Sequence, residues 1–456
     1  MGTVIDMAAD TGKNYLAEFD ALKDDEKLPM VRKWMATEPL PFFKQLRAQR
    51  PILVTPECTL VAGFNDIRDL LAMPKIFTMD LYKPKMGVTD DDPGYMMAHD
   101  DDAFHCREKN LMMGMLNRDD IPDVRKLIET ESKKILDEAS GEIEIVYNFC
   151  RWVPATMVEK YFGLDGIDKK QLIDWSYWNQ YDAFQNQPFN LNTKEKFKSI
   201  VDEHDRVSKD LSAYIAKLIA MKLAMVKAEQ AKNFILMGYY FFKNIVKKIF
   251  GIKSDKLTDT MVLRMLRTNY AKEVDFNLIR VGVNAGGLLI GAIETSSQAV
   301  AQTIKFFIDR PELHEKAKDA ASLNDPEKFD SMVWEALRYV PIGPYIFRKL
   351  SQDYTLAKGT DHETKLPAGE NILVLTQSAM FDETAYKNPD EFEPDRNWYH
   401  NFCFGFGSHE CLGKYVGMVM LPEMVRQVML RSNLEAKSDM DFKNTPFPES
   451  YVLKWD

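Results

Sequence analysis

The feature that most constrains this chain is a glycine-rich loop that ends in a cysteine, residues 404–413, with the sequence FGFGSHECLG. Its glycines allow a tight turn and let the backbone approach a flat ligand closely. The apolar run at 415–421 predicts that a helix begins just after the loop. A thiolate at Cys411 would then lie at a helix N-terminus, which lowers the pKa of a cysteine. The alternative interpretation is a buried structural cysteine in a turn.

The rest of the pattern predicts a mainly α fold with a smaller β region. Residues 105 to about 320 show mainly helical spacing of apolar side chains. Residues 51–63 alternate and are rich in β-branched side chains, which indicates a pair of strands, and residues 371–376 indicate another. Between them, residues 80–102 combine aspartates with glycine and proline, as is typical of a long exposed loop.

Composition and charge narrow the class of protein. Apolar residues make up 45% of the chain and charged residues 28%, as in ordinary globular proteins. The net charge of −10 argues against a nucleic-acid partner. Five cysteines without a close pair do not indicate a disulfide framework, and the N-terminus does not show a signal-peptide pattern. The sequence therefore predicts a protein of the reducing cytoplasm.

Two apolar segments raise the question of membrane contact. The uncharged run between Arg280 and Glu294 is too short to cross a bilayer and is typical of a buried core helix. Residues 234–251 are apolar and then basic. They indicate either a helix packed on the body of the protein or a surface in weak contact with a membrane.

Two further motifs lie upstream of the cysteine loop. Glu335 and Arg338 are three residues apart on a predicted helix and therefore share one face, and Arg396 follows in the segment FEPDR. The second motif, GAIETS at 291–296, places Glu294 beside Thr295 within a helical pattern. Alone, each has an ordinary interpretation: a surface ion pair for the first, and a threonine bonded to its own backbone for the second.

Together, and in this order, these segments resemble the cytochrome P450 family, in particular its bacterial members. The loop matches the haem-binding signature Phe-x-x-Gly-x-His/Arg-x-Cys-x-Gly, Glu335 and Arg338 match the Glu-x-x-Arg pair, and 291–296 resembles the oxygen-activating motif of the central helix. The resemblance covers the chain from about residue 39 to its end. It implies a single cytochrome P450 domain over residues 1–456, with 1–36 as an N-terminal lead-in, and one haem b.

The resemblance also implies roles for individual residues. Cys411 would be the iron ligand, and a thiolate there donates electron density that favours O–O cleavage. Thr295 and Glu294 would handle protons. The remaining cofactor-binding residues would be His105, Lys109, Arg348, Phe404, His409 and Gly413, with Glu335, Arg338 and Arg396 shaping the core around the loop.

The sequence departs from the family pattern at several positions. Lys109 stands where an arginine is usual, which keeps the charge and loses the bidentate geometry. Ala292 replaces the more usual glycine, and Met420 stands where an acidic residue is common. Pro422 close behind predicts that the helix after the loop is kinked or short.

The implied activity is that of a monooxygenase that inserts one oxygen atom from O2 into an apolar substrate: a fatty acid, a terpenoid or a steroid-like molecule. Because only 45 residues follow Cys411, electrons would come from separate partners, a ferredoxin or flavodoxin with its reductase. Alternatives are a haem-thiolate peroxygenase, isomerase or dehydratase, and a non-enzymatic haem sensor or carrier. A zinc site on Cys403, His409 and Cys411 lacks a clean ligand pair.

By the same resemblance, the substrate pocket would draw on the 80–98 loop, the 172–190 region, the central helix, residues 342–347 and the C-terminal loop. Their aromatic and methionine side chains predict an apolar, adaptable pocket, with core packing as the alternative for any one of them. The candidates are Met86, Tyr95, Met96, Met97, Trp175, Tyr177, Trp178, Phe184, Leu288, Leu289, Ile342, Tyr345 and Phe447.

Overall fold

The computed structural model describes residues 3–4, 12–249, 259–268 and 274–456, and the side chains of 12–231, 259–268 and 274–456. The helices are α1 (Tyr15–Ala21), α2 (Asp24–Thr37), α3 (Pro39–Gln49), α4 (Phe64–Leu71), α5 (Ala103–Met115), α6 (Ile121–Glu138), α7 (Trp152–Met157), α8 (Lys169–Gln185), α9 (Lys194–Ile249), α10 (Met261–Arg267), α11 (Leu278–Ile308), α12 (Pro311–Ala321), α13 (Pro326–Tyr339), α14 (Thr376–Ala379) and α15 (Lys414–Met429).

The strands are short and fewer. They are β1 (Thr3–Val4), β2 (Ile52–Val54), β3 (Thr59–Val61), β4 (Phe77–Thr78), β5 (Glu142–Glu144), β6 (Ile346–Leu350), β7 (Tyr354–Leu356), β8 (Thr364–Leu366), β9 (Asn371–Val374), β10 (Glu391–Phe392), β11 (Glu435–Ala436) and β12 (Val452–Lys454). The mainly α fold with a smaller β region is confirmed.

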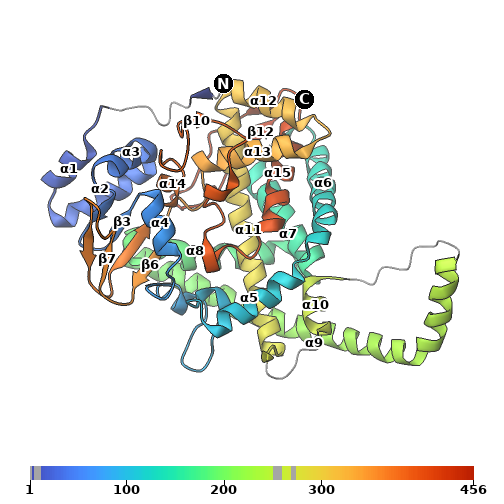
Figure 1. Cartoon of the computed structure of the whole chain (residues 1–456). Coiled ribbons are helices and arrows are strands. Elements are labelled where there is room, and N and C mark those ends of the chain that lie inside the picture. The colour runs from blue at the N-terminus through green and yellow to red at the C-terminus, as the bar shows by residue number, and fades with distance from the viewer. Residues whose placement is uncertain (1–2, 5–11, 250–258, 269–273) are drawn as a thin grey trace.

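The largest sheet holds five strands in the order β2-β3-β9-β6-β4. β3 and β9 pair in parallel and the other neighbours pair antiparallel. Within it Arg348 on β6 lies opposite Ile372 on β9. Figure 1 shows the strands gathered at one edge with α1 to α3, and α11 crossing the middle of the helical part.

The segment predicted to be a core helix is part of α11, which packs against α8, α9, α13 and α15. It begins cleanly because the Asn277 side chain accepts hydrogen bonds from the N–H groups of Ile279 and Arg280. Among the described helices, α11 alone is long and apolar enough by composition to cross a membrane, but half of its most apolar window is buried in the protein. The core-helix prediction is confirmed.

Three local predictions have different outcomes in the structure. The strand pair at 51–63 is confirmed as β2 and β3. The helix after the cysteine loop is not short, because α15 continues through Pro422 to Met429. The prediction for 234–251 rests on side chains that lie outside the described residues, and 250–251 lie outside them altogether.

From Tyr15 onward the N-terminal lead-in is helical, as α1 and α2, and its buried side chains pack with those of α3. Tyr15, Trp34 and Phe42 are buried, and their rings meet at centroid distances between 5.2 and 5.7 Å. Such edge-on and tilted contacts stabilise aromatic pairs beyond the area they bury. The single domain over 1–456 stays a prediction.

Candidate active site

The cysteine loop turns where glycine is needed. Gly405 and Gly407 have φ values of 74° and 67°, a left-handed conformation that side chains other than glycine rarely adopt. The loop closes through a 2.8 Å hydrogen bond from the Cys411 N–H to the Phe404 carbonyl, and α15 begins after Gly413. The sequence therefore presents Cys411 at the start of a helix, as predicted.

The exposed surface of Cys411 lies on the wall of an internal cavity. Protein surrounds the sulfur on its other sides, and this burial raises the pKa of the Cys411 thiol; the Gly413 N–H and the positive charge of Lys109 act in the opposite direction. The predicted lowering of this pKa by the helix terminus is therefore wrong in net direction, because burial outweighs it. A bound metal cation would favour the thiolate at such a position.

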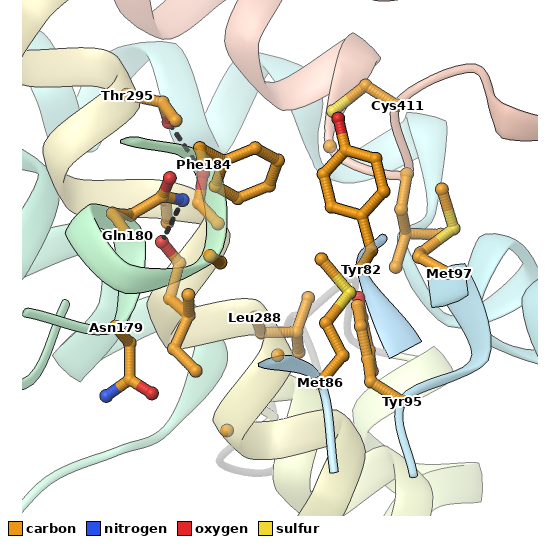
Figure 2. Close-up of a pocket in the computed structure, with 18 of the residues that line it drawn as sticks. Tyr82, Met86, Tyr95, Met97, Asn179, Gln180, Phe184, Leu288, Thr295 and Cys411 are labelled. Atoms are coloured by element: carbon orange, nitrogen blue, oxygen red, sulfur yellow. Dashed lines mark hydrogen bonds between the residues drawn. The ribbon is translucent and has the colours of Figure 1, made fainter. Parts of the chain in front are cut away.

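The cavity has a volume of about 1020 Å³. It is lined mainly by α8, α9, α11 and the cysteine loop, and Phe404, Gly413 and Thr295 all lie on its wall. Figure 2 shows Cys411 on one side of this pocket and Gln180 and Asn179 on the other. A side chain on Gly287 of α11 would collide with the Tyr95 ring, so the small residue makes room here.

Arg348 and His409 line the same cavity. Within the described residues, both ring nitrogens of His409 are buried without a hydrogen-bond partner. Burial and the charge of Arg348 lower the pKa of His409 to about 2, and burial also lowers the pKa of Arg348. The guanidinium of Arg348 donates 2.8 Å to the Phe347 carbonyl. Two buried donors without an acid between them fit the carboxylate groups of a haem.

His105 and Lys109 hold the backbone of the cysteine loop. His105 Nε2 lies 3.0 Å from the Ser408 carbonyl, while Lys109 Nζ donates to Ser408 O and, at 2.7 Å, to Glu410 O. In the described part of the chain neither side chain reaches the cavity wall. Their role at a propionate thus stays a prediction, and the structure shows them fixing the loop in place.

The three charged residues predicted to shape the core do come together. Glu335 accepts from Arg338 Nη2 at 2.7 Å and from Arg396 Nε at 3.1 Å. Arg338 also donates to the carbonyls of Met380, Pro389 and Glu391. These bonds tie α13 to the segment that leads into the cysteine loop, which is how a buried bidentate arginine fixes local geometry.

The two residues of the central-helix motif face different surroundings. Thr295 lies at the cavity, and its hydroxyl donates 2.7 Å to the Gly291 carbonyl in its own helix. Glu294 is fully buried and accepts from Arg151 Nε at 2.8 Å and Nη2 at 3.2 Å. Burial raises the pKa of Glu294, opposed by Arg151. The structure places its carboxylate in an ion cluster away from the cavity wall.

Sequence reasoning missed the rest of that cluster. Arg151 also donates 3.2 Å to Glu449, whose other oxygen accepts from the Tyr177 hydroxyl at 2.7 Å. The available signal was Arg151 itself, a charge inside the otherwise apolar run at 146–157. Such a charge is rarely buried without a partner.

The predicted pocket residues divide into two groups. Met86, Tyr95, Met97, Phe184, Leu288 and Ile342 line the cavity. The others do not contribute to its described wall; Tyr177, for example, packs edge-on to Phe447 at 5.1 Å and Tyr345 accepts from Arg32. Core packing, the alternative for each of these side chains, holds for the second group: Met96, Trp175, Tyr177, Trp178, Leu289, Tyr345 and Phe447.

Among the described residues no group of three or more histidine, cysteine or acidic side chains is arranged to hold a metal ion by itself. The zinc alternative on Cys403, His409 and Cys411 therefore lacks a ligand cluster. A macrocycle that brings its own nitrogen ligands needs only one protein donor, which Cys411 supplies at the cavity.

Comparisons with known proteins identify the family of this chain. The profile of the family described as Cytochrome P450 matches residues 144–454. The steroid C26-monooxygenase of Mycolicibacterium smegmatis is 23% identical over 77% of this chain and 76% of its own length. The structure of CYP109E1 from Bacillus megaterium in complex with testosterone has a TM-score of 0.67 at 18% identity, covering 95% of this chain and 100% of that one. The structure of P450BioI bound to an acyl-carrier protein has a TM-score of 0.70 at 16% identity, covering 93% and 100%. This chain therefore belongs to the cytochrome P450 family, as a haem b monooxygenase.

Proposed function

We propose that this enzyme hydroxylates an apolar organic molecule that enters the 1020 Å³ cavity and reaches the space beside Cys411. One oxygen atom of O2 enters the substrate and the other leaves as water, with two electrons and two protons supplied from outside. The observation that carries the proposal is a single large cavity, mostly apolar, that ends on both Cys411 and Thr295.

Haem b, when bound, supplies the iron that activates oxygen. In this chain Cys411 would hold the iron, and Arg348 and His409 would hold the propionates, because both line the cavity without an acidic partner among the described residues, and the ring nitrogens of His409 lack any hydrogen bond. Phe404 and Gly413 flank the sulfur: the ring of Phe404 lies on the cavity wall, and Gly413 leaves space beside Sγ.

Thr295 is the residue placed to hand on a proton at the cavity. Its hydroxyl gives its hydrogen to the Gly291 carbonyl, which leaves the oxygen free to accept from water or another donor. Glu294 would act as the acid behind it. To do so, its carboxylate must exchange the bonds to Arg151 for a contact with water near Thr295.

The substrate is proposed to be steroid-like or terpenoid rather than small. Support comes from the cavity size and from the steroid C26-monooxygenase among the relatives, together with the testosterone-bound neighbour. A fatty acid is the further candidate from the sequence, and it differs from the other two classes by its charged carboxylate.

Electrons are proposed to come from a ferredoxin or flavodoxin with its reductase, in the cytoplasm. All five cysteines are free, which supports a reducing compartment. The test is turnover under ¹⁸O2 with NADPH, a ferredoxin and its reductase, with product analysed by mass spectrometry. We expect one ¹⁸O per product and no product without the reductase. Product formed with peroxide alone, and none with the electron chain, would instead establish a peroxygenase.

A further inference from the structure

The cavity wall carries a small polar region between α8 and α9. His204 and Ser208 are four residues apart on α9 and therefore lie on one face, and both line the cavity. Asn179 of α8 faces them: the Ser208 hydroxyl donates 3.1 Å to the Asn179 carbonyl oxygen. We call Asn179, His204 and Ser208 the polar end.

The polar end has capacity left for a ligand. Within the described residues, His204 Nδ1 is buried without a hydrogen-bond partner. Asn179 uses one amide hydrogen on the Trp175 carbonyl at 2.8 Å, which leaves its second N–H unassigned to any other contact described. Asn179 is only 6% exposed, so an unmet polar atom here costs free energy.

The next turns of α9 are mainly apolar and close the cavity against α11. Leu211, Ile215 and Ile219 line it, and the Ile215 and Ile219 side chains meet α11 at Gly282. From His204 to Ile219 this wall is about 22 Å long at 1.5 Å per residue. Beyond the polar end the α9 wall is thus mainly apolar, with Ser212 as its one further polar side chain on the described wall, over a length that suits an extended hydrophobic molecule.

The cationic side chains on the described wall offer little attraction to an acidic group of a ligand. Lys85 and Arg348 are the permanently charged side chains on the described wall. Lys85 is already paired at 2.7 Å with Asp182, which is buried and also accepts from Asn186. Arg348 is assigned to a propionate. A ligand carboxylate would therefore lose its hydration without gaining an unpaired cation.

We propose that Asn179, His204 and Ser208 bind an uncharged hydroxyl or carbonyl group of an otherwise apolar substrate, and that the enzyme selects such neutral molecules over carboxylic acids. The inference rests on the proposed function, because it assumes that substrate occupies this cavity. Binding of one polar group away from Cys411 would fix which part of the molecule approaches the reacting centre.

The test uses substrate-induced spin-state shifts of the haem-loaded protein, which report binding and not turnover. Titrations at one fixed pH compare 5α-cholestane with 5α-cholestan-3-one at one fixed cyclodextrin concentration. We expect the ketone to bind about tenfold more tightly. Equal affinities in the wild type would overturn the inference and leave the proposed function standing. If neither steroid gives a shift, the proposed substrate class fails as well.

Two variants locate the effect. Ser208→Ala and Asn179→Leu should each bring the ketone's affinity close to that of the hydrocarbon. Ser199→Ala is the matched control, because Ser199 is an exposed serine on α9 whose hydroxyl bonds only to Lys196 O. Haem content and circular dichroism establish folding of each. A folded Ser208→Ala variant that keeps the full preference for the ketone would show that the polar end does not bind it.

Selection of neutral molecules over carboxylic acids is tested with hexadecan-1-ol and hexadecanoic acid, which have the same hydrocarbon chain length. The wild type should bind the alcohol more tightly. Asp182→Asn releases Lys85 from its partner and should strengthen binding of the acid by about tenfold while leaving the alcohol unchanged. Tighter binding of the acid by the wild type would contradict selection of neutral substrates.

Discussion

The region of the cysteine loop and the acid of the central helix, Glu294, differ in whether their buried polar atoms have hydrogen-bond partners. In the loop region His409 has two buried ring nitrogens that lack partners, and Arg348 interacts with the Phe347 carbonyl and the Tyr82 hydroxyl but with no acidic side chain among the described residues. At Glu294, both carboxylate oxygens are taken by Arg151. The first arrangement leaves polar atoms at the cavity wall without an acidic partner among the described residues. The second is a closed cluster that must open before it can give a proton.

The largest expected effect comes from breaking the closed cluster. Arg151→Leu would leave the buried Glu294 and the half-buried Glu449 without this cation, and should lower the free energy of unfolding by about 3–5 kcal/mol. Chemical denaturation of the holoenzyme measures it. Arg206→Leu is the control, because its pairs with Asp174 and Glu203 are exposed and should be worth at most about 1 kcal/mol. Equal losses in both variants would mean that the cluster is not specially stabilised.

The role of Arg348, beside the cysteine loop, should appear in the retention of haem. Arg348→Met removes a buried charged donor and should speed transfer of haem to apomyoglobin by about 10- to 100-fold. Lys109→Met should have a smaller effect on transfer, since Lys109 holds the loop backbone and not the cavity wall. If Lys109→Met releases haem faster than Arg348→Met, the propionate assignment moves to Lys109.

A smaller change concerns proton delivery at the cavity. Thr295→Ala should lower product formed per electron consumed several-fold and leave the spin-shift Kd nearly unchanged, because Thr295 donates to its own helix and not to a neighbouring element. Thr295→Ser keeps the hydroxyl and should restore most of the coupling. Unchanged coupling in Thr295→Ala would mean that protons arrive by another route.

The smallest effect is a pH dependence at Glu294. Its folded pKa is raised, so the folded state holds this proton to higher pH than the unfolded chain does. The contribution of Glu294 to stability is therefore present below the ordinary pKa of a glutamate and is lost as the pH rises through the folded value. Relative to Glu294→Gln, the wild type should become less stable from pH 4 upward in denaturation at stepped pH. A difference that grows in the opposite direction would contradict a raised pKa.

The cysteine loop was predictable because its requirements are local. Positive φ values at Gly405 and Gly407 and a helix start after Gly413 follow from residue types at adjacent positions. The pairing of Glu335 with Arg338 follows in the same way from helical spacing.

Two features were not predictable: the pairing of the Glu294 side chain with Arg151 and the net pKa shift of Cys411. Both depend on contacts between distant segments. Arg151 lies 143 residues from Glu294 along the chain, and Glu449 lies 298 from Arg151. Burial of Cys411 is likewise a property of the packed molecule. It outweighs the helix terminus that the sequence shows.

The polar end is likewise a feature that depends on contacts between distant segments. His204 and Ser208 have helical spacing that the sequence displays, but their shared cavity with Asn179 appears only once α8 and α9 pack together. Of the pocket residues predicted on the 80–98 loop by family resemblance, Met86, Tyr95 and Met97 line the described wall and Met96 is packed in the core.

The central claim is that Cys411 binds the haem iron as a thiolate. The most direct measurement is the absorption spectrum of the purified protein, reduced and exposed to carbon monoxide, beside that of Cys411→Ala. The account predicts a strongly red-shifted Soret band in the wild type and its loss in the variant. A band at the position typical of histidine or neutral-thiol ligation in the wild type, or a red-shifted band that survives in Cys411→Ala, would contradict it.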